Sequence, residues 1–580
     1  MIRRRLPWVA LILILSAALA LMWPRMRDDT ATNDEPAFLG AGYSYWLGHR
    51  YYLNVEHPPL LQLWSGLPLL FLHVNVPADA QSLFSPTNDT ISSQMTEPWD
   101  FQMQSGAEAL TPSEGFYHYA AMETGLFGYK VLFDDGNATD MLLFWGRFMQ
   151  ALVVLATGLT VFLWAKSIST ATGGLLAAAA WCFNPLALAY GHLIITDPGI
   201  ALMLTVSVWM FSRFLITPRP RTALAAGVAF GAALLTKYTA IILIPIFAVL
   251  ILLAWWKQGR QFASGRYGNL FLNLLLIGVV AWAAVLAMYL FRWSPAPPLS
   301  AADAQRLHVP SWFMQLRCVL VPRDYFKGLA IMLLHVVNGH HAYLLGTWSD
   351  KGWWYYYLVA ILVKTPLALL VLTFATVAMA VWRIRRSTFG EAVPPLAAAA
   401  YLACAMTSRA DIGIRHVLPI YPLLAVVAGV ECARGRKREQ IFGWVLVAWL
   451  AATTFAARSD YIAYFNELVG GPSRGQDYLI DSNYDWGQNG RALQQWLEAR
   501  HISHVYIDYF GTGAALRHLR IPVEFVKPPD VPHLRDGYLV ISATRLMAPE
   551  YDWLCEHHQP TTRIANTLFV YTLPPSVPRR

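Results

Sequence analysis

Charged residues are scarce in this chain of 580 residues. Asp, Glu, Lys and Arg make up 14% of it, whereas soluble domains contain about 25%. Hydrophobic residues make up 56%, and they come in long uninterrupted runs instead of periodic faces. These proportions exclude a disordered or fibrous protein and argue against a soluble enzyme. They indicate a protein that crosses a membrane several times.

Several motifs are also missing. The five cysteines have no CxxC spacing, which argues against a disulfide framework or a zinc knuckle; they are Cys182, Cys318, Cys404, Cys432 and Cys555. The chain has no GxSxG, Walker, GxGxxG or HExxH motif, which argues against hydrolase, ATPase, dehydrogenase and zincin chemistry. The net charge is +8, but the basic residues fall in short loops between apolar runs, so we expect no nucleic-acid partner.

The first apolar run, Leu6 to Trp23, follows three consecutive arginines, Arg3 to Arg5. A signal peptide is one interpretation, because Ala18-Leu19-Ala20 resembles a cleavage site. The length of the run and the many later runs favour a retained anchor. The arginines then predict a cytoplasmic N-terminus by the positive-inside rule.

Ten further apolar runs follow, which gives about eleven predicted spans. They lie at 143–165, 174–192, 198–216, 222–236, 238–256, 270–291, 355–382, 393–408, 416–433 and 440–457. The boundaries between 174 and 256 are hard to set, and 174–216 could contain a re-entrant segment. Alternation from a cytoplasmic N-terminus places every short basic loop on the cytoplasmic side, which supports an odd number of spans.

The opposite, outer side receives three large segments: 24–142, 292–354 and 458–580. We therefore predict a transmembrane domain over 1–457 and a small outer α/β domain over 458–580. In the first segment, the apolar stretch from Pro58 to Leu72 is short for a span and is predicted to lie along the membrane interface. In the tail, alternating runs at 504–509, 537–542 and 567–572 predict strands, and 488–500 predicts a helix.

Acidic residues on the predicted outer side are the first candidates for chemistry. Asp34 and Glu35 are adjacent and follow the first span by about ten residues. Two acids in a loop are often merely solvated, so the pair alone decides nothing. Glu56 precedes His57-Pro58-Pro59 and could bind a metal or a sugar hydroxyl. Asp197 lies between Thr196 and Pro198, where it could equally cap a helix.

Basic residues on the outer side oppose the positive-inside trend and suggest a fixed anionic ligand. Lys237, Arg409 and Arg415 are of this kind, and Lys364 falls inside an apolar run. A lipid phosphate at the interface fits that description, because Arg can bind phosphate through two hydrogen bonds. The alternative is pairing with a nearby carboxylate, for which Asp411 would serve.

Three histidines of the second outer segment, His335, His340 and His341, could bind a divalent metal if Glu56 joined them. Such histidines are more often simply interfacial. The stretch 481–488 (Asp-Ser-Asn-Tyr-Asp-Trp-Gly-Gln) is polar and rich in turn residues. We interpret it as a structural loop that faces the membrane domain, and the alternative is a contact with an acceptor.

The order of these segments resembles one family, the phospholipid-carrier-dependent glycosyltransferases of the GT-C type, which include the protein O-mannosyltransferases and the lipid A aminoarabinose transferase. The matching motifs are Asp34-Glu35, His57-Pro-Pro-Leu60, Thr196-Asp197, Thr236-Lys237-Tyr238, Gly413 to Pro422 and Tyr464 to Leu468. The last two look like bacterial members of family 39. The resemblance covers nearly the whole chain and implies a mostly helical GT-C fold.

Such enzymes transfer a sugar from a polyprenyl-phosphate to an acceptor hydroxyl at the outer face, with inversion at the anomeric carbon. The resemblance implies that Asp34 deprotonates the acceptor, that Glu35 supports it and that Asp197 orients a substrate. An acceptor oxygen does need a nearby base, and charge does develop on the leaving phosphate. Lys237, Arg415 and His416 are the expected phosphate-binding residues.

A divalent cation, which some relatives hold beside the donor phosphate, would map to Glu56, His340 and His341, although the spacing of the histidines differs here. No nucleotide cofactor is expected. The expected partners are the lipid bilayer, the lipid-linked donor and an acceptor protein, lipid or glycan. The expected location is a bacterial inner membrane, with the active site and the tail on the periplasmic side. The alternative function is a transporter or flippase of a lipid-linked sugar that makes no bond.

Overall fold

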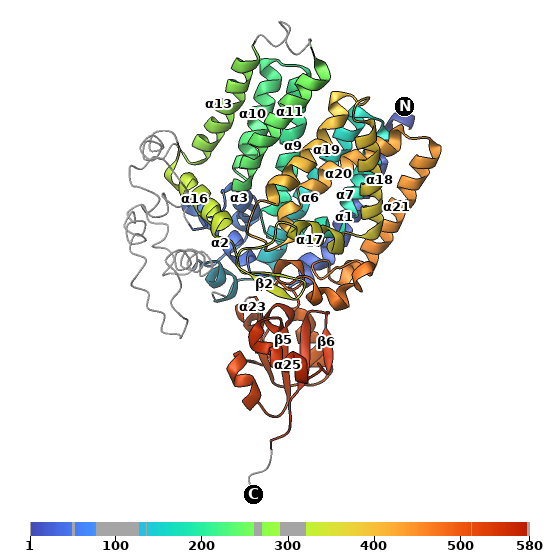
Figure 1. The fold of residues 1–580 in the computed structure, drawn as a ribbon. Coiled ribbons are helices and arrows are strands. Elements are labelled where there is room, and N and C mark those ends of the chain that lie inside the picture. The colour runs from blue at the N-terminus through green and yellow to red at the C-terminus, as the bar shows by residue number, and fades with distance from the viewer. Residues whose placement is uncertain are drawn as a thin grey trace.

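The apolar runs fold into helices, because a backbone removed from water must satisfy its own hydrogen bonds. The computed structural model describes residues 2–48, 51, 53–76, 127–134, 136–259, 269–290, 321–511 and 513–576. All eleven predicted runs coincide with helices (Figure 1), and the mostly helical fold is confirmed. The helices are α1 (Ile2–Asp28), α6 (Thr139–Ile168), α7 (Ala171–Cys182), α8 (Pro185–Gly191), α9 (Asp197–Ile216), α10 (Pro220–Leu234), α11 (Leu243–Gln258), α13 (Leu270–Met288), α17 (Tyr356–Lys364), α18 (Leu367–Arg383), α19 (Phe389–Ala405), α20 (Ile420–Arg434) and α21 (Lys437–Ala456).

By length and apolar composition, six helices of the described residues can cross a membrane, or seven if α7 and α8 count as one span. Prolines account for part of the difference from eleven. Asn184 accepts a hydrogen bond from Leu186 N and caps α8, and Pro185 follows it, so the predicted span 174–192 bends by 60°. The predicted span 355–382 is likewise divided, because Thr365 is extended before Pro366.

The basic connections between helices meet at one end of the bundle, the end where Figure 1 marks the N-terminus. Three contacts join them: Lys257 Nζ donates to Ser387 O at 2.8 Å, Arg383 Nη1 pairs with Glu431 Oε2 at 2.9 Å, and Arg434 Nη2 pairs with Glu391 Oε1 at 2.6 Å. This grouping is what the alternation of spans requires. Which face of a membrane this end meets stays a prediction.

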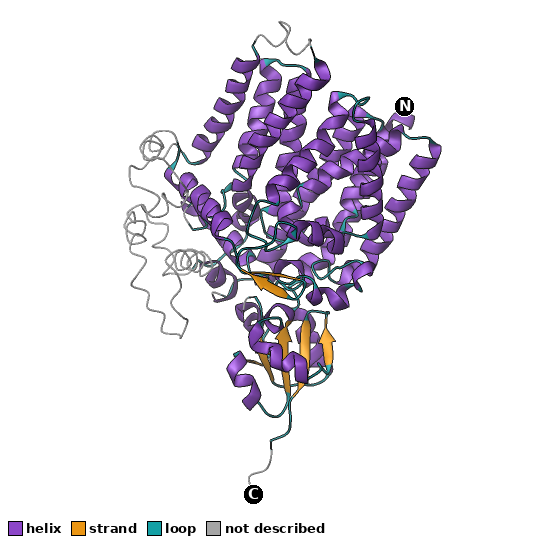
Figure 2. Ribbon diagram, in the orientation of Figure 1, coloured by secondary structure: helices purple, strands orange, loops and turns teal. Residues whose placement is uncertain are grey.

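The other end of the bundle carries a small α/β domain, which confirms the α/β fold predicted for the tail (Figure 2). Its five strands are β3 (Val505–Asp508), β4 (Val523–Phe525), β5 (Tyr538–Ser542), β6 (Thr562–Ile564) and β7 (Leu568–Thr572), in the order β4-β3-β5-β7-β6. β3 is parallel to β4 and β5, and the remaining pairs are antiparallel. β3, β5, β7 and helix α22 (Gly490–Ala499) lie where they were predicted; β4 and β6, of three residues each, were not foreseen.

Residues 460–489 join this domain to the bundle. Lys364, at the end of α17 and 0% exposed, donates to Ile462 O at 2.7 Å and to Asn483 O at 2.5 Å. Its ammonium lies 4.4 Å from the ring centroid of Phe465. Asn466 Nδ2 donates to the carbonyl of Thr365 at 2.9 Å, which satisfies a carbonyl near the break between α17 and α18. The α/β domain is thus attached to the bundle by buried polar contacts.

The described residues of the first outer segment include the helices α2 (Glu35–Gly48) and α3 (Leu60–Gly66), and α3 continues as a 3₁₀ turn over Leu67–Phe71. The helix predicted at 58–72 therefore forms, and it is shorter than a span. α2 and α3 cross in backbone contact, because a Cβ on Gly42 would lie 2.0 Å from Gln62 O. This close approach holds residues 53–59 against the start of α2.

Candidate active site

A cavity of about 450 Å³ opens among α9, α19, helix α16 (Arg323–Asn338) and the start of α2. Six of the nine residues predicted for the site line it, although they come from distant parts of the chain. These residues are Asp34, Glu56, Asp197, Lys237, Arg415 and His416. The convergence follows from topology, because each residue lies at the end of a helix or in a connection between helices at the same end of the bundle as the α/β domain.

Asp34 lies immediately before α2, with 27% of its side chain exposed. Its Oδ2 accepts a hydrogen bond from Arg415 Nη1 at 3.0 Å. The preceding residue, Asn33, donates its backbone N–H to Trp486 O at 3.2 Å, so the tail fixes the backbone beside Asp34. The carboxylate is therefore both held in place and accessible from the cavity.

Asp197 is the first residue of α9 and is 2% exposed. Its Oδ1 pairs with Lys237 Nζ at 2.7 Å, and its Oδ2 lies 3.9 Å from Arg415 Nη1. The helix start has no side-chain cap from Thr196. The carboxylate thus orients both cations of the cavity. Capping of the helix alone would not explain these contacts.

Arg415 stands on a 3₁₀ turn, η6 (Ile414–Val417), with 11% of its side chain exposed. Its guanidinium carbon lies 4.3 Å from the ring centroid of Trp486. Burial would lower the pKa of Arg415, but Asp34 and Asp197 raise it above its usual value. Its Nε is buried, and no described residue accepts a hydrogen bond from it. The side chain is charged and retains one unused donor.

Arg415 does pair with carboxylates, as the alternative prediction required, but its partners are Asp34 and Asp197. Asp411, the partner named in that prediction, instead accepts the backbone N–H of Trp353 on its Oδ2 at 2.6 Å. The neighbouring His416 lines the cavity, with Tyr357 Oη 3.5 Å from its Nδ1, and its backbone carbonyl accepts from Tyr401 Oη at 2.8 Å.

Glu35 does not line the cavity, and its side chain is 0% exposed. It forms a two-bond ion pair with Arg147 of α6: Nε to Oε1 at 2.8 Å and Nη2 to Oε2 at 2.6 Å. Oε1 also accepts from Ile194 N at 3.1 Å, and Oε2 from Thr32 N at 2.9 Å. Burial would raise the pKa of Glu35, but Arg147 and these hydrogen bonds hold it below its usual value. Glu35 is thus a positioning residue behind Asp34.

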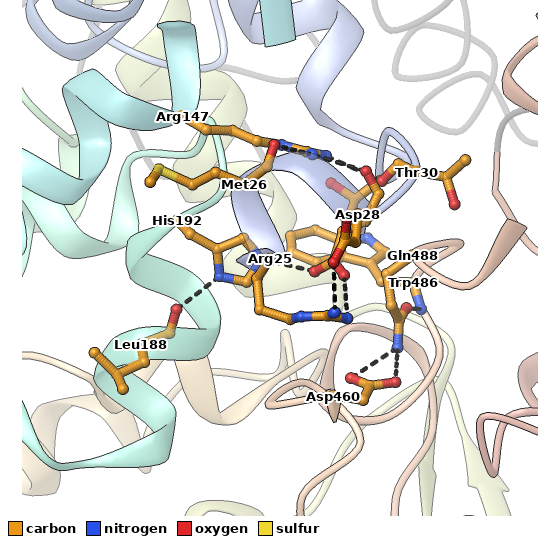
Figure 3. Close-up of polar contacts among 12 residues, drawn as sticks. Arg25, Met26, Asp28, Thr30, Arg147, Leu188, His192, Asp460, Trp486 and Gln488 are labelled. Carbon is orange, nitrogen blue, oxygen red and sulfur yellow. Dashed lines mark hydrogen bonds and ion pairs between the residues drawn. The ribbon is translucent and has the colours of Figure 1, made fainter. Parts of the chain in front are cut away.

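Arg147 also fixes the turn that follows α1. Figure 3 shows its guanidinium directed at this turn, where it donates to the carbonyls of Met26 at 3.2 Å, Asp29 at 2.7 Å and Thr30 at 3.0 Å. In the apolar run 143–165 we did not single out Arg147, although an arginine at membrane depth is itself a functional signal.

A second group of contacts holds the same turn from α8 and the tail (Figure 3). Asp29 pairs with His192 Nε2 at 2.8 Å and with Arg25 Nη1 at 3.0 Å. Burial would raise the pKa of Asp29, but His192 and Arg25 hold it below its usual value. Thr30 donates its N–H to Gln488 O at 2.9 Å, and Gln488 Nε2 donates to Asp460 Oδ2 at 3.2 Å. Three separate parts of the chain therefore fix the segment that ends at Asp34.

His57 also lines the cavity, although we named it only as part of a motif. Its ring lies 4.7 Å from that of Phe38, and its Nδ1 is 3.4 Å from Thr196 Oγ1. Burial, helped by the nearby Lys237, lowers the pKa of His57 to about 3. The ring is neutral at physiological pH and can accept or donate a hydrogen bond.

The predicted metal ligands do not come together. Glu56 lines this cavity, whereas His340 and His341 line a second one. His341 Nδ1 pairs with Asp350 at 2.6 Å, and His340 Nδ1 lies 2.8 Å from the carbonyl of His341. Across the described ranges no group of three His, Cys, Asp or Glu side chains is arranged to hold a metal ion. These three residues are therefore not a metal centre here, and use of a cation stays a prediction.

We expect Arg147→Met to destabilise the protein by about 3–5 kcal/mol, because it leaves the carboxylate of Glu35 buried without its cation. The melting temperature in detergent measures this loss. Arg213→Met, which removes an exposed arginine from the end of α9, is the matched control and should melt with the wild type. Equal melting temperatures for the Arg147 variant and the wild type would show that the pair does not stabilise the fold.

Glu56 gives a pH-dependent prediction. Burial, followed by repulsion from Asp34, raises the pKa of Glu56 to about 7. The folded state thus holds a proton that the unfolded state releases near pH 4.5, so this contribution to stability is complete below pH 4.5 and is lost as pH rises through 7. The stability gained by Glu56→Gln over the wild type should therefore grow from about pH 5 to 8, to on the order of 3 kcal/mol at the upper end, and its melting temperature should rise accordingly. A gap that stays constant with pH, as expected for the exposed control Glu467→Gln, would contradict the assignment.

One part of the chain matches a known protein family. Residues 140–287, about a quarter of the chain, match the family model described as dolichyl-phosphate-mannose-protein mannosyltransferase. The matched segment runs through α6 to α13 and includes Arg147, Asp197 and Lys237. No curated protein matches the chain.

Solved structures with a similar chain path are known. ArnT from Cupriavidus metallidurans bound to undecaprenyl phosphate has 14% identity, with 97% of each chain covered and a TM-score of 0.45. The apo oligosaccharyltransferase of Archaeoglobus fulgidus has 14% identity and a TM-score of 0.49, over 90% of this chain and 65% of that one. The family match confirms the resemblance predicted from the motifs over this part of the chain: residues 140–287 are similar to the dolichyl-phosphate-mannose-protein mannosyltransferases.

Proposed function

We propose that this protein transfers a sugar from a polyprenyl-phosphate donor to an acceptor hydroxyl, with Asp34 as the general base and with inversion at the anomeric carbon. The observation that carries the proposal is the cavity itself. It places an accessible carboxylate beside two cations, and the guanidinium of one of them, Arg415, has an unused donor. Following the predicted orientation, we assign the cavity to the periplasmic face of a bacterial inner membrane.

The cavity suits a lipid phosphate. Lys237 and Arg415 supply positive charge. The Nε–H of Arg415, which no carboxylate of the cavity uses, can donate to a phosphate oxygen. Apolar side chains form another part of the wall, where a prenyl chain can lie; they include Ile200, Ile241, Ile242, Ile331, Met332 and Leu333. A ligand with an anionic head and an apolar tail matches both parts.

The reaction follows from these positions. Asp34 takes the proton of the acceptor hydroxyl, and the acceptor oxygen forms a bond to the anomeric carbon of the sugar. The bond between that carbon and the phosphate oxygen breaks, and its electron pair leaves with the polyprenyl-phosphate. Lys237 and Arg415 stabilise the charge that grows on the leaving phosphate. No step requires a metal ion or a nucleotide.

Arg415 connects the two halves of this reaction. Without a ligand it donates to Asp34 and so occupies one oxygen of that carboxylate. A bound donor phosphate competes for the same guanidinium. As Arg415 turns toward the phosphate, Asp34 Oδ2 is freed to accept the proton of the acceptor hydroxyl. Asp197 keeps Lys237 and Arg415 within reach of each other during the exchange.

We expect Asp34→Asn to abolish transfer while the protein stays folded, because an amide cannot accept the proton. Purified protein in detergent is incubated with a panel of polyprenyl-phosphate sugars and envelope extract, and mass spectrometry follows released polyprenyl-phosphate. Asp28→Asn, an exposed acid six residues earlier, is the matched control and should remain active. Turnover by Asp34→Asn at the wild-type rate would refute the proposed base, and binding of intact donor without any release would favour a transporter.

We expect Arg415→Gln to weaken binding of polyprenyl-phosphate by about 10- to 100-fold, because the lost hydrogen bonds are to a charged group. Arg409→Gln is the control, since Arg409 is exposed on the same connection between α19 and α20 and does not line the cavity. Thermal stabilisation of each variant by added undecaprenyl phosphate measures the affinity. Equal stabilisation of the Arg415 variant and the wild type would remove Arg415 from the phosphate site.

A further inference from the structure

A second cavity, of about 530 Å³, lies beside the first, where the bundle meets the α/β domain. Ile412 lines both cavities, so the two adjoin. The other walls of the second cavity come from the hairpin of β1 (Ala342–Leu344) and β2 (Thr347–Ser349), from Asp481 and from Thr544 to Glu550. Figure 2 shows the hairpin between the bundle and the sheet, and Trp348 Nε1 donates to Met547 O at 2.9 Å.

One polar atom in this cavity lacks a partner. Asp411 is 1% exposed, and only its Oδ2 is used, by the backbone N–H of Trp353. Its Oδ1 is buried, and nothing in the described part of the chain donates to it. A buried acceptor without a donor is costly, so the position calls for a ligand that supplies a donor.

The remaining walls combine acids with aromatic rings. Asp481 lies within electrostatic range of Arg415 and Asp34, which places it at the side facing the first cavity. The Trp348 ring packs on His341, with centroids 4.4 Å apart, and against Tyr343 at 5.3 Å. Glu550 adds a third carboxylate, against one arginine, Arg545, which is paired with Asp508 at 2.9 Å.

We propose that this second cavity binds the acceptor, and that the bound part of the acceptor is a neutral or amino sugar. Sugar hydroxyls are hydrogen-bond donors that satisfy Asp411 and Asp481, and the C–H faces of a sugar ring pack on aromatic side chains. An acyl chain would leave Asp411 Oδ1 without a donor. A phosphorylated group would meet three carboxylates. That the bound sugar is the acceptor rests on the proposed function, whereas the proposal of a sugar site rests only on the residues that line the cavity.

The position of the cavity agrees with the chemistry. A sugar that contacts Asp481 and Ile412 lies at the boundary with the donor cavity, where one of its hydroxyls can approach Asp34. The acceptor then reaches Asp34 from the side of the α/β domain, and the lipid donor reaches Asp34 from the apolar wall of the first cavity. The two substrates do not compete for one entrance.

The test uses the full-length protein in detergent and measures binding of neutral and amino-sugar disaccharides by saturation-transfer NMR. Asp411→Asn and Trp348→Phe are the variants; Glu556→Gln, an exposed acid on the α/β domain, is the control. We expect at least one disaccharide to bind the wild type and the control. We expect its affinity to fall about tenfold or more in both variants, whereas affinity for undecaprenyl phosphate is unchanged.

The same disaccharide, added to the donor-release assay, should stimulate release, and the variants should raise the KM for the sugar. Binding of no disaccharide by the wild type, equal binding by both variants, or stimulation by a serine-containing peptide alone would overturn the inference. Failure of the proposed function is recognised separately, as absence of polyprenyl-phosphate release from every donor. In that case the NMR arm still decides whether the cavity holds a sugar.

Discussion

The ion pair between Glu35 and Arg147 is the interaction on which the candidate site depends. Its carboxylate receives hydrogen bonds from the turn before α2 and also from Ile194, three residues before Asp197. Its guanidinium donates to the carbonyls of Met26 and Asp29, at and just after the end of α1. One buried pair therefore fixes the relative position of Asp34 and Asp197, which belong to different parts of the fold. A pair of this kind is costly to desolvate, and it is tolerated here because every one of its hydrogen bonds is directed at a segment that carries site residues.

Within the cavity, charges of both signs are kept close together. Asp34, Asp197, Lys237 and Arg415 neutralise one another while no ligand is bound, so none of them is left uncompensated in a largely buried space. The charged groups therefore remain paired with one another until a ligand binds. An anionic ligand exchanges partners with the carboxylates and does not need to bring a counterion.

Much of this arrangement is readable in the sequence. The apolar runs predict the helices, and three of the five strands of the tail follow from alternation. The acids and bases of the cavity were found because they lie on the predicted outer side, where topology disfavours cations. Length alone could not place the bends, but Asn184-Pro185 and Thr365-Pro366 signal them, since a residue before proline avoids the helical conformation.

Other features depend on contacts between distant segments, for which one sequence gives no signal. The ring of Trp486 lies against Arg415, and no local pattern links these two positions. His341 pairs with Asp350 and not with Glu56. The reason is that the β1–β2 hairpin packs on the α/β domain and not on the first cavity. Arg147 was overlooked because its apolar surroundings were sufficient to explain the run as a span.

The loop at 481–490 has a consequence for how the protein is made. The backbone beside Asp34 is held by Trp486 and Gln488, and Gly490 N donates to Thr30 Oγ1 at 2.7 Å. A chain emerges from the ribosome with its N-terminus first, so Asp34 is delivered early and then waits for the last fifth of the polypeptide. During insertion the base has no fixed position, and the cation–π partner of Arg415 does not yet exist. The cavity is therefore complete only when synthesis is nearly finished, and the transfer that we propose cannot start earlier.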